Sequence, residues 1–213
     1  MSEDSNIAKQ PQKAKKPRMN PLKRIHYNAP FTLTFALAAL AVLGLAKLTN
    51  NASNVRLFSV YRAPLTDPLT YVRFFGHVLG HADLQHYTSN FLILLMVGPL
   101  LEEKYGSGPL AVMTAITALI TGVIFVVITG GSALMGASGV VFMLILLSSF
   151  ANIQAGRIPL TLVAAFAVYI GQEIFRGITS SDNVSQLAHI VGGACGVVCG
   201  FYATKLVRRK PRA

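Results

Sequence analysis

The sequence predicts an all-α membrane protein, a six-transmembrane-helix bundle with its N- and C-termini on the cytoplasmic side. Of its 213 residues, 53% are hydrophobic and 13% are charged, whereas soluble domains carry about 25% charged residues. Apolar runs long enough to span a hydrocarbon core of roughly 30 Å recur along the chain. The basic residues are concentrated near the two ends. This composition argues against a soluble enzyme, a disordered chain or a disulfide scaffold.

The net charge of +11 comes from the two ends of the chain. Residues 1–29 hold seven Lys or Arg and two acids, and residues 205–213 hold five Lys or Arg and no acid. An even number of spans puts both ends on the cytoplasmic side, as the positive-inside rule requires. No basic helix or aromatic platform accompanies this charge. The sequence therefore argues against nucleic-acid binding and for a chain whose surroundings are the lipid bilayer.

The first half of the chain divides by polarity. Residues 1–30 form a basic tail, rich in Lys, Pro and Gln, that is expected to be disordered. The first span, residues 31–48, is apolar up to Lys47. Residues 49–75 are mixed in polarity and too long for a tight turn, so a short helix or an interfacial segment is expected there. The second span, residues 83–105, has a polar first third.

The second half continues the membrane domain, which is expected to cover residues 31–207. Residues 110–128 form a third, strongly apolar span, and a Gly/Ser-rich loop at 130–137 separates it from a short fourth span. The last three spans are expected at residues 138–152, 158–175 and 185–207, and residues 208–213 form a second basic tail.

The sixth span carries a stripe of small residues. Gly192, Gly196 and Gly200 are each four residues apart, a spacing that lets a neighbouring helix approach closely. Cys195 and Cys199 lie on the same apolar helix and are interpreted as small packing residues rather than a disulfide. The stripe fits packing within one chain and packing between chains, so the sequence leaves the oligomeric state open.

Four polar residues stand inside apolar spans, where polar groups are costly and are candidates for function. His86 and Asn90 are four apart near the start of the second span, Ser138 opens the fourth, and His189 lies one turn into the sixth. These three spans all run from outside to inside. The four residues are therefore expected at similar depth below the outer face.

This layer has the chemistry of acyl transfer. A serine hydroxyl needs a base, and histidine is its usual partner. Gly136 and Gly139 around Ser138 permit a sharp turn, and the free N–H groups of a helix N-terminus stabilise an oxyanion. No carboxylate lies deep in the sixth span. The nearest acid, Asp182, is seven residues before His189 and in a loop, so a Ser–His dyad is expected. No H-E-x-x-H arrangement is present, and no metal or cofactor is expected.

Each residue taken alone also has a structural interpretation. Small Ser and Gly contacts are common between membrane helices, and a lone His189 fits an interhelical hydrogen bond. His86 and Asn90 fit a polar clamp between helices. His77 and His81 are expected to be structural residues of a loop or an interface. The joint arrangement favours catalysis over these separate interpretations.

The order of these motifs resembles the rhomboid family of intramembrane serine proteases. The resemblance extends from about residue 72 to residue 201. It is carried by Arg73 with Phe74 and Phe75, His77, His81, His86 to Asn90, Glu102 with Gly106 and Ser107, Gly136-Ala137-Ser138-Gly139, and Ala188-His189 with Gly192 and Gly196.

The resemblance implies roles for individual residues. Ser138 would be the nucleophile and His189 the general base, while His86, Asn90 and the Ser138 N–H would form the oxyanion hole. Two further residues, Arg73 and Glu102, would be structural. The sequence departs from the family pattern at Val72, where Trp is expected, and at Phe142, where Tyr is common; a Phe142 ring can still stack on the base.

The predicted function is an endopeptidase that cleaves single-span or multi-span membrane proteins within or beside a transmembrane helix, near the outer face. The predicted location is the bacterial inner membrane. The fifth span and the loop at 176–185 are expected to admit substrate laterally. Two alternatives stay open: a rhomboid-fold protein that binds membrane helices without cutting them, and a small transporter. The sequence shows no internal repeat of the kind that many transporters have.

Overall fold

The computed structural model describes residues 27–129, 131–153 and 183–208, together with four isolated helical positions in the segment between them. The regular secondary structure of the described residues is helical, and the β-structure there is one isolated antiparallel bridge between Val60 and Leu134, which confirms the predicted all-α class for these residues. The helices are α1 (Pro30–Leu48), α2 (Ala52–Leu57), α3 (Pro68–Gly76), α4 (Leu84–Tyr105), α5 (Ser107–Ile128), α6 (Ser138–Ile153) and α8 (Asn183–Arg208).

The helix boundaries agree closely with the predicted first, second, fourth and sixth spans. α5 begins three residues earlier than predicted. Gly106, with a φ of 89°, is both the C-cap of α4 and the N-cap of α5, so a single residue separates the two helices. The mixed segment 49–75 contains α2 and most of α3. The predicted fifth span and residues 176–182 of the predicted loop lie outside the described residues, except for the four helical positions at 160, 163, 167 and 171. Residues 183–185, predicted to end this loop, already belong to α8.

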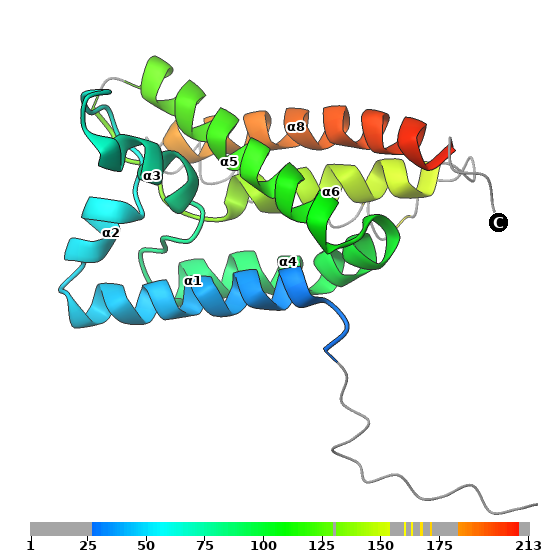
Figure 1. Cartoon of the computed structure of the whole chain (residues 1–213), viewed down its shortest axis with the longest axis horizontal. Coiled ribbons are helices and arrows are strands. Elements are labelled where there is room, and N and C mark those ends of the chain that lie inside the picture. The colour runs from blue at the N-terminus through cyan, green and yellow to red at the C-terminus, as the bar shows by residue number, and fades with distance from the viewer. Residues whose placement is uncertain are drawn as a thin grey trace, which may run out of the picture.

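The helix α6 occupies the centre of the bundle. It packs most extensively against α8 and also contacts α4 and α5. Figure 1 shows α1 and α4 side by side along one side of the molecule, α8 along the opposite side, and α2 and α3 at one end. The side chains of residues 140–145 are all buried, so this helix supplies much of the hydrophobic core.

The glycines of α8 are the reason that α6 and α8 approach so closely. A Cβ on Gly192 would lie 2.1 Å from the carbonyl oxygen of Gly139, and a Cβ on Gly196 would lie 2.5 Å from that of Met143. No side chain fits in either place. The predicted packing role of this stripe is therefore confirmed for these two glycines, and the partner is a helix of the same chain.

Two of the helices, α1 and α5, are long and apolar enough to cross a membrane, and α6 and α8 contain shorter apolar stretches at Ser138–Ser149 and Leu187–Tyr202. Many large apolar side chains point outward from these elements. Examples are Leu37, Leu40, Val112, Ile116, Val127, Ile190 and Val198. An outer surface of this kind is suited to lipid rather than to water.

The buried carboxylate of Glu102, near the end of α4, joins three helices. It accepts hydrogen bonds from the backbone N–H of Phe31 (2.7 Å) and of Thr32 (2.9 Å) at the start of α1. The hydroxyls of Thr32 and of Ser107, the first residue of α5, donate to it as well. The carboxylate thus satisfies two free backbone N–H groups at the start of α1 and the hydroxyl of the first residue of α5. This arrangement agrees with the structural role that the resemblance implies.

Arg73 has a comparable structural role in α3. Its side chain is buried, donates to the carbonyl of Arg56 and forms an ion pair with Asp67, the N-cap of α3. The guanidinium also lies 4.6 Å from the ring centre of Tyr61. A hydrogen bond from the N–H of Leu69, followed by the bond from Arg73, holds the pKa of Asp67 below its usual value. These contacts hold α3 against α2 and against the segment between the two helices.

Candidate active site

The four polar residues singled out in the sequence lie at the beginnings of three helices. His86 and Asn90 occupy the first two turns of α4, Ser138 is the first residue of α6, and His189 lies in the second turn of α8. Asp83 is the N-cap of α4, and its carboxylate accepts the N–H of His86 at 2.7 Å. The helix beginnings adjoin one another, because Gly136 lies against the His86 ring and Gly139 lies against the carbonyl of Ala188.

The chain turns into α6 at a glycine that no other residue could replace without strain. Gly136 has a φ of 128°, which L side chains rarely adopt. A Cβ at this position would also lie 2.8 Å from the imidazole of His86. Gly136 therefore allows both the turn and the close approach of the His86 ring to the backbone that leads into Ser138.

Segment 131–137, which precedes Ser138, is fixed to the chain between α2 and α4. Leu134 exchanges two backbone hydrogen bonds with Val60, each 2.9 Å long. The N–H of Gly136 donates to the carbonyl of His77 at 2.9 Å, and the N–H of Ala137 donates to Nε2 of His81 at 3.3 Å. The nucleophile candidate thus follows a backbone that is held at three successive points.

On the other side, the neighbour of Ser138 packs against the helix that carries His189. A Cβ on Gly139 would lie 3.2 Å from the carbonyl oxygen of Ala188, and Gly192 touches the backbone of Gly139. Residues before and after His189 therefore both contact the first turn of α6. The imidazole of His189 is buried and stacks on Phe142, with ring centres 4.7 Å apart and an angle of 10° between the planes.

The polar side chains of α4 are arranged around the same region. Asn90 is 3% exposed, and its amide nitrogen donates to the carbonyl of His86 at 2.9 Å. A carboxamide nitrogen carries two hydrogens, so the second N–H of Asn90 is a further donor. His86 is half-buried, and its ring lies 5.0 Å from that of His81.

His77 and His81 were predicted to be structural residues of a loop or an interface, and they lie between α3 and α4. Both are structural, and they are completely buried beneath the segment that leads into Ser138. They lie outside the spanning helices, and burial lowers the pKa of each to about 4. The spacing of four between them, immediately before the His86 and Asn90 pair, was the available signal.

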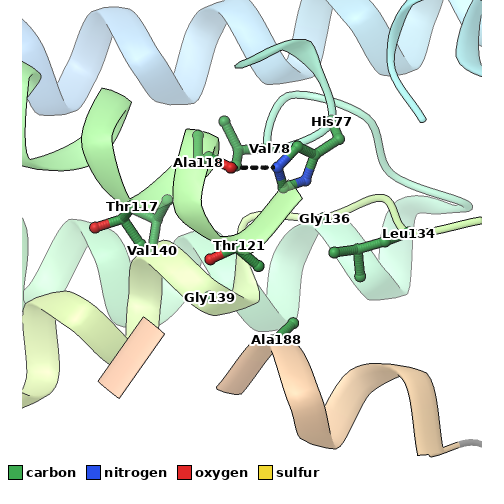
Figure 2. A pocket seen from close by; sticks show the side chains of 10 residues that line it. All are labelled: His77, Val78, Thr117, Ala118, Thr121, Leu134, Gly136, Gly139, Val140 and Ala188. Carbon is green, nitrogen blue, oxygen red and sulfur yellow. Dashed lines mark hydrogen bonds between the residues drawn. The ribbon is translucent and has the colours of Figure 1, made fainter. Parts of the chain in front are cut away.

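Figure 2 shows His77 on the wall of a narrow space that Gly136 and Gly139 also line, with its ring directed at Ala118. Its Nε2 lies 3.1 Å from the carbonyl oxygen of Ala118 on α5 and, because a carbonyl only accepts, Nε2 carries the hydrogen. Thr121, Gly136, Gly139 and Ala188 surround a space too narrow to admit water.

Among the residues described, no three His, Cys, Asp or Glu side chains gather to hold a metal ion.

The fold and the site define a helical membrane protein whose polar residues converge at the start of a central helix. Residues 68–206 match the family model described as the Rhomboid domain. This match covers more than half of the chain, which therefore belongs to the rhomboid family.

Curated relatives carry the name Rhomboid protease GlpG. The protein of Enterobacter sp. (strain 638) is 27% identical over 198 residues, which cover 85% of this chain and 66% of the relative. That of Klebsiella pneumoniae (strain 342) is 28% identical over 194 residues, with coverages of 87% and 67%. That of Salmonella newport (strain SL254) is 29% identical over 147 residues, with coverages of 65% and 50%. The chain thus spans about two thirds or less of these relatives' length.

Proposed function

We propose that this protein is an intramembrane serine endopeptidase that uses Ser138 as nucleophile and His189 as general base. The observation that carries the proposal is the contact between α6 and α8. Gly139, next to Ser138, packs against Ala188 and Gly192, which stand on either side of His189 in the sequence. Membership of the rhomboid family and similarity to relatives named rhomboid proteases support the same activity.

In the proposed reaction, the Ser138 hydroxyl attacks the carbonyl carbon of a peptide bond while His189 accepts its proton. The resulting tetrahedral intermediate collapses, the imidazolium protonates the departing amine, and an acyl-enzyme remains. Water then attacks the ester with His189 again as the base. The carboxylic acid product is released and the Ser138 hydroxyl is regenerated. The Phe142 ring stacked on His189 supports the base in one orientation.

The negative charge of the intermediate requires donors near Ser138. The Ser138 N–H is one of the N–H groups that a helix leaves without an intrahelical partner at its N-terminus. His86 and Asn90 are the proposed side-chain donors. Contact of the His86 ring with Gly136 and the second N–H of Asn90 support this assignment.

We further propose six membrane spans with both termini in the cytoplasm, and the bacterial inner membrane as the location. The concentration of Lys and Arg near the two ends supports this topology. The site then lies near the outer face, where water is within reach. The substrates are transmembrane helices of single-span or multi-span proteins. Cleavage near a helix-destabilising residue is expected, because the carbonyls of an intact helix are hydrogen-bonded and shielded.

The test is cleavage of a single-span reporter by the purified protein in liposomes, with the cut site identified by mass spectrometry. Wild type should cut within or beside the apolar segment, and Ser138→Ala should not. Ser149→Ala is a matched control, because Ser149 lies on the same helix and its hydroxyl bonds only locally, to the carbonyl of Ile145. Absence of both cleavage and labelling of Ser138 by a fluorophosphonate would instead support binding of helices without catalysis.

A further inference from the structure

The two N–H groups that precede Ser138 are both occupied by the segment between α3 and α4. Gly136 donates to the carbonyl of His77, and Ala137 donates to the imidazole of His81. The carbonyl of Ala137 is also engaged, since it accepts the N–H of Val141 at 2.9 Å. Hydrogen bonds therefore hold the peptide group on each side of Ala137.

The partners of His81 define its protonation state. Nδ1 lies 3.1 Å from the carbonyl oxygen of Leu79, which only accepts, so Nδ1 carries the hydrogen. The N–H of Ala137 only donates, so Nε2 presents a lone pair. Burial, reinforced by the nearby His86, lowers the pKa of His81 to about 4, which agrees with this neutral form at ordinary pH.

We propose that His81 is a positioning residue that orients the backbone N–H of Ser138 toward the developing oxyanion, an inference that rests on the proposed function. In a trans peptide the N–H of Ser138 points opposite to the carbonyl of Ala137. That carbonyl is directed into α6 by Val141, and the other side of Ala137 is held by His81. The N–H of Ala137 is committed to His81. The N–H of Ser138 is the first of the N–H groups that α6 leaves without an intrahelical partner at its start.

The surroundings of His81 make it a rigid support. The side chain has no exposed surface, and the ring meets those of His86, Tyr87 and Phe91 at centre distances between 5.0 and 5.7 Å. The Asn54 amide donates to the backbone carbonyl of His81 at 3.0 Å. Because the His81 ring is fixed on several sides, its Nε2 holds the N–H of Ala137 in one place.

Two substitutions separate positioning from packing. In His81→Gln the amide oxygen lies four bonds from Cα, as Nε2 does, so the variant keeps an acceptor for Ala137. In His81→Asn the amide lies three bonds from Cα, as Nδ1 does, so the variant keeps the contact with Leu79 and loses that acceptor. The readouts are the fluorophosphonate acylation rate of Ser138, the thermal unfolding midpoint, and hydrogen exchange at the Ala137 amide.

We expect His81→Gln to acylate within a few-fold of wild type and His81→Asn to acylate about 10- to 100-fold more slowly, with similar unfolding midpoints, since misplacement by about 1 Å costs up to about 10²-fold. Exchange at Ala137 should accelerate only in His81→Asn. Equal acylation by the two variants, or rates that merely follow their stabilities, would overturn the positioning role. If the fluorophosphonate does not label Ser138 in the wild type while the Ala137 amide is protected from exchange, the proposed function is refuted instead.

Discussion

Replacement of Gly192 by alanine should separate the two helices that carry the proposed dyad. The added Cβ would lie 2.1 Å from the carbonyl oxygen of Gly139, whereas ordinary van der Waals contact begins at 3.4 Å. The backbones must therefore move apart by roughly 1.3 Å, the difference between these distances. The obstacle is backbone on both sides, so no rotamer change relieves it. Overpacking of this kind costs about 1–3 kcal/mol, and a displacement of about 1 Å lowers a rate by up to about 10²-fold.

The assay compares kcat/KM for the reporter and the thermal unfolding midpoint in Gly192→Ala with those of two controls. Gly193→Ala alters the next residue of α8, where the new Cβ meets only side chains, the nearest being Leu146 at 3.1 Å. Gly44→Ala alters an exposed position of α1 with no atom within 4 Å. We expect a rate loss of about 100-fold for Gly192→Ala alone. Wild-type activity and stability in that variant would refute the inferred backbone contact.

Three further predictions follow from the described contacts. Glu102→Ala should lose about 3–5 kcal/mol of stability, because it strands donors at two helix starts; exposed Glu103→Ala should lose almost none, and unfolding in detergent compares them. Phe142→Ala should slow acylation about tenfold through loss of the stacked ring, whereas Phe142→Tyr keeps the rate. The free energy of unfolding should fall as pH drops from 6.5 toward 4, by up to about 3 kcal/mol each for His77 and His81. In this range the two histidines are protonated in the unfolded chain and stay neutral in the folded chain. Unfolding midpoints measured against pH should decline less steeply in His81→Gln.

Helix positions were predictable because the signals are local. The apolar runs that mark the spans are visible in the sequence itself. The third span was predicted to start at residue 110, whereas α5 begins at Ser107 and includes Pro109. Proline is tolerated in the first turn of a helix, where its missing N–H has no partner to lose. The helix therefore begins as soon as the positive φ of Gly106 has turned the chain.

The partners of the key side chains were not predictable, because they come from distant parts of the chain. The sequence identified Gly192 as a packing residue but gave no means of finding Gly139 as its contact. It likewise predicted His81 to be a structural residue of a loop or an interface, but it did not identify Ala137, 56 positions away, as the partner of His81. Such pairings depend on how the helices are arranged in three dimensions, which periodicity along one helix does not specify.

The start of α6 is held by two kinds of contact, and they constrain different things. On the α8 side the constraint is steric, because glycine brings the backbones together and sets the distance of His189 from the first turn of α6. On the other side the constraint is directional, because hydrogen bonds from Gly136 and Ala137 fix how the peptide groups are oriented. Attack by a serine needs both a base at the right distance and an oxyanion donor at the right angle. Packing sets the distance and hydrogen bonds set the orientation, so the proposed positioning role of His81 is distinct from the contribution of the glycine contacts.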